Sequence, residues 1–125
     1  MQSDLLFFFQ AHPKALPLYK ALEKQILQRI DGVAVQVQKS QISFYRRHLF
    51  ACVSFLRLRK KKDCPENYIV LTFGLNRRLD SPRVEAVTEP YPRRFTHHMF
   101  LCCIEDIDAE VMGWLEEAAG FAAVK

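Results

Sequence analysis

The spacing of the apolar residues changes at Gly32, and this change limits what the chain can fold into. Before Gly32, apolar residues recur at intervals of three or four, namely Tyr19, Leu22, Ile26 and Ile30. This period predicts an amphipathic helix that begins near Pro17 and ends at the glycine. After Gly32, valines alternate with small or polar residues, at Val33, Val35 and Val37. Such alternation is typical of a half-buried strand.

Three further apolar runs predict strands, over residues 50–59, 67–75 and 94–104. A helical turn around residues 84–87 is expected in the connection between the last two strands. Ser3 can cap a short helix that ends before Pro13, and Asp106 can cap a C-terminal helix. The apolar stripe of that last helix consists of Ile107, Val111, Leu115, Ala118 and Ala122, with Trp114 beside it.

Strands that follow one another, rather than alternating with helices, favour an antiparallel sheet. The predicted fold is therefore a single α+β domain over residues 1–125, with a four-stranded antiparallel sheet in a simple meander. Two N-terminal helices and one C-terminal helix are expected to pack on this sheet. Half of the 125 residues are hydrophobic, which is enough for one independent core.

The N-terminal apolar stretch, residues 5–9, is too short to span a bilayer and has no basic region before it. We therefore predict a cytoplasmic protein with no membrane association, in which the four cysteines stay reduced. Phe7, Phe8 and Phe9 are expected in the core or, alternatively, at the interface of a homodimer.

The last predicted strand contains two adjacent histidines and two adjacent cysteines, within the run RRFTHHMFLCC. Successive residues of a strand point to opposite faces, so His97 and His98 cannot hold one metal ion together, nor can Cys102 and Cys103. No metal and no cofactor is therefore predicted. The cysteines are expected to be small buried hydrophobic residues, whereas for the histidines a core role and a site role both stay open.

Arginines occur in three pairs, Arg46–Arg47, Arg77–Arg78 and Arg93–Arg94. In a four-stranded meander all three pairs would lie at one end of the sheet, together with Lys39 and Arg83, whereas the basic run 57–62 would lie at the other end. Because the guanidinium group suits phosphate and carboxylate, this end is predicted to bind an anion. The predicted ligand-binding residues are Lys39, Gln41, Arg46, Arg77, Arg78, Arg83, Arg93, Arg94, His97 and His98.

The run KSQISFYRR before the second predicted strand has an extended pattern. Its polar residues, at Lys39, Gln41, Ser43 and Tyr45, would project to one side, with Ile42 and Phe44 on the other. Two interpretations are equally open, a strip of donors that leads to the arginines and an ordinary exposed strand edge. A serine nucleophile is disfavoured, because no Gly-x-Ser-x-Gly elbow and no glycine-rich phosphate loop accompanies Ser43.

Several ordered motifs of the chain resemble a bacterial family, domain of unknown function 5655. They are FFQAHPKALPLYKAL, KSQISF, IVLTFGLNRRLDSPR, RRFTHHMFL and DIDAEVMGWLEEA. The resemblance covers nearly the whole chain, and KSQISF and FTHH are its most specific parts. It implies a fold without an activity, and no catalytic residue comes with it.

Three functions remain compatible with the sequence. The favoured one is a non-enzymatic binding module whose basic rim holds a nucleotide-like small molecule or nucleic acid, as the excess of four positive charges suggests. The second is an enzyme that acts on a small anionic substrate with His97 or His98 as general acid or base. The third is a protein-interaction or oligomerisation domain that uses the phenylalanine-rich N-terminus.

Overall fold

The computed structural model describes residues 2–124 of the chain. Its three α-helices are α1 (Gln2–Phe8), α2 (Leu16–Arg29) and α3 (Ala109–Ala123). Its strands are β1 (Ala34–Val37), β2 (Ile42–Arg46), β3 (His48–Ser54), β4 (Ile69–Leu75), β5 (Ala86–Tyr91) and β6 (Arg94–Leu101). Short 3-10 helices lie at η1 (Pro13–Ala15), η2 (Lys61–Asp63) and η3 (Ile104–Asp106).

The strands form one antiparallel sheet in the order β1-β2-β3-β4-β6-β5. The α+β class and the antiparallel pairing are as predicted. The number of strands is not, because the sheet has six strands instead of four. The meander is likewise correct only from β1 to β4, since β6 lies between β4 and β5. The expected helical turn at residues 84–87 is replaced by the start of β5.

The run KSQISFYRR contains β2, which lies between β1 and β3 inside the sheet and is therefore not an exposed edge. Ile42 and Phe44 are fully buried beneath the helices, opposite Val53 and Ala51 of β3. Ser43 points to the other face and is also fully buried. Its hydroxyl donates to the Gln38 side chain at 3.0 Å and accepts from Gln41 Nε2 at 2.8 Å. A serine at this position is tolerated because its hydroxyl is hydrogen-bonded on both sides.

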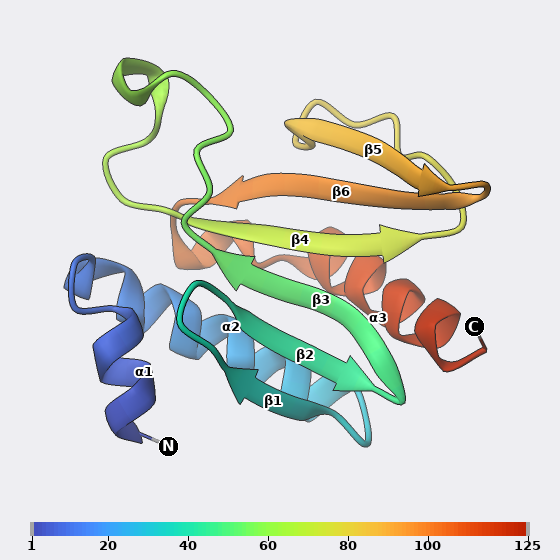
Figure 1. Cartoon of the computed structure of the whole chain (residues 1–125), viewed down its shortest axis with the longest axis horizontal. Helices are drawn as coiled ribbons and strands as arrows, with labels where there is room; N and C mark the ends of the chain where they lie inside the picture. The colour runs from blue at the N-terminus through green and yellow to red at the C-terminus, as the bar shows by residue number, and fades with distance from the viewer. Residues whose placement is uncertain (1, 125) are drawn as a thin grey trace.

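Helices α2 and α3 lie side by side on one face of the sheet, as Figure 1 shows. The predicted stripe of α3 is buried, together with Met112, Trp114 and Ala119. The N-cap of α3 is Asp108, which accepts from the Val111 backbone N–H at 3.0 Å, and not Asp106 as predicted. Asp106 instead accepts from the backbone N–H groups of Cys102 and Cys103.

The phenylalanine cluster and the cysteine pair depart in part from expectation. Of the three phenylalanines only Phe9 is fully in the core, whereas the Phe7 side chain is 70% exposed. Cys102 is half-buried and Cys103 is exposed, because the strand ends at Leu101. The prediction that Cys103 is a buried hydrophobic residue was therefore wrong.

Candidate functional site

The three arginine pairs lie at the same end of the sheet. Strands β2, β4 and β5 run toward this end, and β3 and β6 start from it, at the right of Figure 1. We call the six residues that gather here the arginine end: Arg46, Arg47, Arg77, Arg78, Arg93 and Arg94. Antiparallel pairing brings them together, because each pair lies where a strand starts or finishes at the same end of the sheet.

Three residues that were expected to share this site lie elsewhere. Lys39 follows β1, and β2 then runs back toward Arg46, so Lys39 and neighbouring Gln41 lie at the opposite end. The added strand β2 is the reason, because it reverses the chain direction once more. Arg83 also lies at that far end, where its guanidinium donates to Asp108, Glu110 and the Asp106 carbonyl at 2.8–3.0 Å.

Two arginines of the arginine end have left-handed backbone conformations. Arg47, which alone joins β2 to β3, has φ of 69°, and Arg93, in the turn between β5 and β6, has φ of 63°. Residues other than glycine and asparagine rarely adopt this backbone conformation, because their Cβ atom crowds the carbonyl oxygen. Each turn therefore holds an arginine where glycine would be less strained.

The arginine end keeps most of its positive charge unpaired. Arg77 donates two hydrogen bonds to Glu117 of α3, and these lower the pKa of that carboxyl group. Arg47 reaches the Ala123 carbonyl at the end of α3, and the Arg94 guanidinium lies 5.8 Å from the centre of the Tyr91 ring. Within residues 2–124, the side chains of Arg46, Arg78 and Arg93 take part in no ion pair.

His97 is a core residue. Its ring is fully buried, stacks on Phe73 at 5.1 Å between centroids and accepts the Leu79 backbone N–H at Nε2, 3.0 Å away. Its Nδ1 has no partner within hydrogen-bond distance among the described residues. Burial lowers the pKa of His97, and the nearby positive charges of Arg77 and Arg78 lower it further, while the backbone of Phe73 and Phe95 opposes this only in part. His97 is therefore neutral and enclosed, which removes it as a ligand-binding residue open to solvent.

His98 points to the opposite face of the sheet, on which Figure 1 shows no helix. It is half-buried, and its Nδ1 lies 2.8 Å from the hydroxyl oxygen of Thr72, the residue directly opposite on β4. Thr72 in turn lies opposite Cys52 of β3. These three residues form what we call the polar row.

The chemistry of the polar row favours hydrogen bonding over nucleophilic attack. Burial lowers the pKa of His98 and raises the pKa of the Cys52 thiol, so both groups are neutral near pH 7. Beside them, a shallow hollow of about 150 Å³ opens between the polar row and the arginine end. It is lined mainly by Leu49, Cys52, Thr72, Gly74 and Thr96.

The chain matches the model of one protein family. The model of the family described as domain of unknown function (DUF5655) matches residues 7–122. The chain belongs to this family. No curated protein and no solved structure matches it. The predicted family membership is therefore confirmed.

Neither a metal-ligand cluster nor a membrane-spanning helix is found in the described part of this DUF5655 domain. In residues 2–124, no histidine, cysteine and carboxylate side chains gather in a group of three or more that suits a metal ion. Over the same residues, no helix combines the length and the apolar character that a bilayer crossing requires. The arginine end and the polar row beside it form the candidate site of this domain, and sequence reasoning found the first but not the second.

Proposed function

We propose that this domain binds nucleic acid, with the phosphates held by the arginine end. The observation that carries the proposal is the backbone of Arg93. A turn that needs a left-handed residue is held by an arginine, and this arginine has no ion pair within the described chain. A strained residue whose side chain makes no ion pair within the fold is a reason to look for a functional role of that side chain.

The spread of the arginines favours a polyanion over a small molecule. From β2, which ends at Arg46, to β6, which begins at Arg94, there are three strand spacings, or about 14 Å. Along the axis of a duplex each strand carries one phosphate per ~3.4 Å, so this distance spans several phosphates. A single phosphate would contact only one or two of these guanidinium groups.

The surroundings of the arginine end suit the bases of such a ligand. Tyr91 is 64% exposed and lies beside Arg94, which is the combination of aromatic ring and cation on which a nucleobase stacks. The hollow on the uncovered face of the sheet is lined by Cys52, Thr72 and Thr96, whose side chains can form hydrogen bonds with a base. A single strand, whose bases are accessible, uses these groups better than a duplex does.

The proposal can be tested by titrating the domain into labelled single- and double-stranded oligonucleotides at several salt concentrations. The variant Arg78→Ala/Arg94→Ala removes two charges from the arginine end. The control Lys60→Ala/Lys61→Ala removes the same charge from the opposite end of the sheet. We expect the first variant to bind at least about tenfold more weakly and to lower the salt slope by about 2, with the control close to wild type.

Other results would exclude the proposal. Equal losses in the two double variants would mean that only the net charge matters and that the arginine end is not a site. Absence of binding by wild type at low salt would remove nucleic acid as the ligand. Saturable binding of a mononucleotide, with no gain in affinity from a longer strand, would point instead to a small-molecule site.

A further inference from the structure

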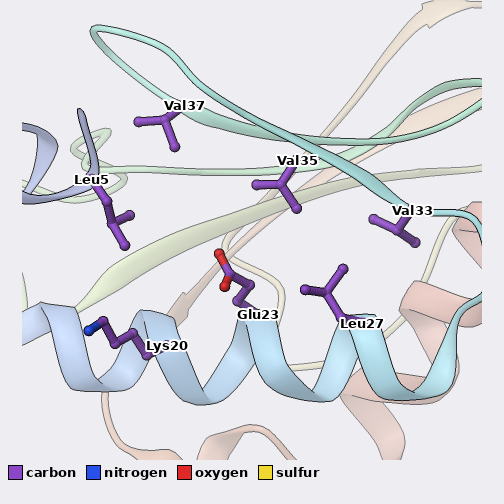
Figure 2. Close-up of a pocket in the computed structure, with 7 residues that line it drawn as sticks. All are labelled: Leu5, Lys20, Glu23, Leu27, Val33, Val35 and Val37. Carbon is purple, nitrogen blue, oxygen red and sulfur yellow. The ribbon is translucent and has the colours of Figure 1, made fainter. Parts of the chain in front are cut away.

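A second surface lies between α2 and β1, at the edge of the sheet that β1 forms. Figure 2 shows this groove, with Val33, Val35 and Val37 above and helix α2 below. Its volume is about 510 Å³, and Leu5 of α1 lies at one end. From α2, Leu27 contributes a 46% exposed side chain, and Lys20 and Glu23 add one charge of each sign. The walls are therefore mainly aliphatic, and their formal charges cancel.

One wall of the groove is an open strand edge. Strand β1 is the first strand of the sheet, and within residues 2–124 it pairs only with β2. Its outer backbone N–H and C=O groups are free to pair with another strand. The groove thus combines unpaired backbone groups with half-buried valines at alternate positions.

The other sheet edge shows what a protected edge looks like in this protein. Strand β5 carries the charged Glu89 and Pro90, two kinds of residue that prevent a further strand from pairing. Strand β1, with the sequence Ala-Val-Gln-Val, carries neither a charge nor a proline. This contrast between the two edges favours a role of the β1 edge in pairing with another strand.

The exposed apolar surface continues past the groove along α1. Phe7, which is 70% exposed, lies with Phe8 beside Val37 at the end of β1. Leu6 is 59% exposed on the same short helix. Exposed aliphatic and aromatic side chains that flank an open strand are typical of a protein interface and not of a solvated surface.

We propose that β1 pairs antiparallel with β1 of a second copy of this chain, so that two sheets join into one across a two-fold axis. The incoming strand must be extended and must present apolar residues at every second position to the helix side. Residues 33–37, Val-Ala-Val-Gln-Val, have this pattern themselves. An antiparallel pair of identical strands is self-complementary, as a two-fold interface requires. The valines of each copy then close the groove of the other.

The test is the mass of the full chain in solution over a wide concentration range, measured by sedimentation equilibrium. We expect a dimer for wild type. Val35→Lys places a charge on the helix side of the edge and is expected to weaken dimerisation at least about tenfold. Leu27→Glu changes an exposed helix residue in the groove and is expected to do the same without unfolding the domain. Val87→Lys, on the protected edge strand β5, is the matched control and should remain dimeric.

Each further outcome also decides the matter. A monomeric wild type at the highest concentration, or a dimer that both groove variants leave intact, would overturn the proposal. If the wild type is monomeric and its β1 amides exchange hydrogen rapidly, the β1 edge is unpaired, and its partner would then be a strand of a different protein. Retained oligonucleotide binding by a monomeric Leu27→Glu variant would show that this interface and the proposed nucleic-acid site are independent.

Discussion

The backbone N–H of Leu79 and the Nε2 atom of His97 lie 3.0 Å apart inside the core. This hydrogen bond ties the connection between β4 and β5 to the middle of β6. It also fixes the protonation of the ring, because a nitrogen that accepts a hydrogen bond cannot carry a proton. A histidine that looked like a candidate site residue thus holds a loop in place.

The first prediction concerns the stability of the fold as the pH falls. Burial lowers the pKa of His97 below its ordinary value of 6.5, so below pH 6.5 the unfolded chain binds a proton that the folded chain does not. The free energy of unfolding should therefore decrease as the pH falls from about 6.5 toward the folded pKa. Urea unfolding at pH 7.5 and 5.0 measures this decrease.

In His97→Leu the histidine contribution to that decrease should disappear. The variant should also be less stable at pH 7.5 by about 1–3 kcal/mol, because the Leu79 N–H loses its acceptor. The same loss of stability between the two pH values in wild type and variant would contradict the prediction. His98→Gln, on the other face of the sheet, shows how much of the decrease the second histidine causes, since its pKa is also lowered by burial.

The second prediction separates folding from binding at Arg93. Arg93→Gly should be more stable than wild type by up to about 1 kcal/mol, because glycine adopts a φ of 63° without the steric cost of a side chain. The same variant should bind oligonucleotides more weakly. Thermal unfolding and the binding titration are compared on one preparation. Reduced stability would mean that the Arg93 side chain supports the turn itself.

The third prediction concerns the start of α3. Asp108 both caps the helix and pairs with Arg83, so Asp108→Ala should lower the free energy of unfolding by about 1–2 kcal/mol. Arg83→Ala should cost less, since exposed ion pairs each contribute about 0.2–1 kcal/mol. A double-mutant cycle on these two residues should show coupling below the cost of Asp108→Ala alone. A neutral Asp108→Ala variant would refute the assignment of the cap.

The fourth prediction concerns the thiols. The pKa values of both Cys52 and Cys103 are raised, so accessibility decides the order, and the exposed Cys103 should be alkylated before the half-buried Cys52. Timed iodoacetamide labelling with peptide mass spectrometry gives the order. Faster labelling of Cys52 than of Cys103 would instead indicate that Thr72 and His98 activate the thiol, which would favour an enzyme.

The elements with a strong hydrophobic period could be predicted from the sequence. The stripe of α3 and the alternation of Val33, Val35 and Val37 depend on local spacing alone, and the structure has both. Strand β2 was harder to predict, because polar Ser43 suggests a solvent-exposed face, whereas it is buried with its hydroxyl hydrogen-bonded to Gln38 and Gln41. Strand β5 is almost fully exposed and contains Pro90, so no burial pattern marks it.

These two missed strands explain the errors in the site. Without β2, Lys39 was expected beside the arginines, although it lies at the other end of the sheet. The prediction that the arginine pairs lie together was correct, because each pair still lies at the same end of the sheet when β2 and β5 are added. Arg83 could not be placed, since its position depends on Asp108 and Glu110, which are far along the chain. The polar row depends on the register of three strands, which no local pattern reveals.

The contact between Arg47 and the Ala123 carbonyl has a practical consequence for constructing fusions. Helix α3 ends beside the arginine end, whereas α1 lies against β1 at the far side of the molecule, as Figure 1 shows. An acidic tag joined after the last helix would compete with phosphate for the guanidinium groups. A bulky partner joined before the first helix would instead crowd the open strand edge, so the side chosen for a label decides which of the two surfaces remains accessible.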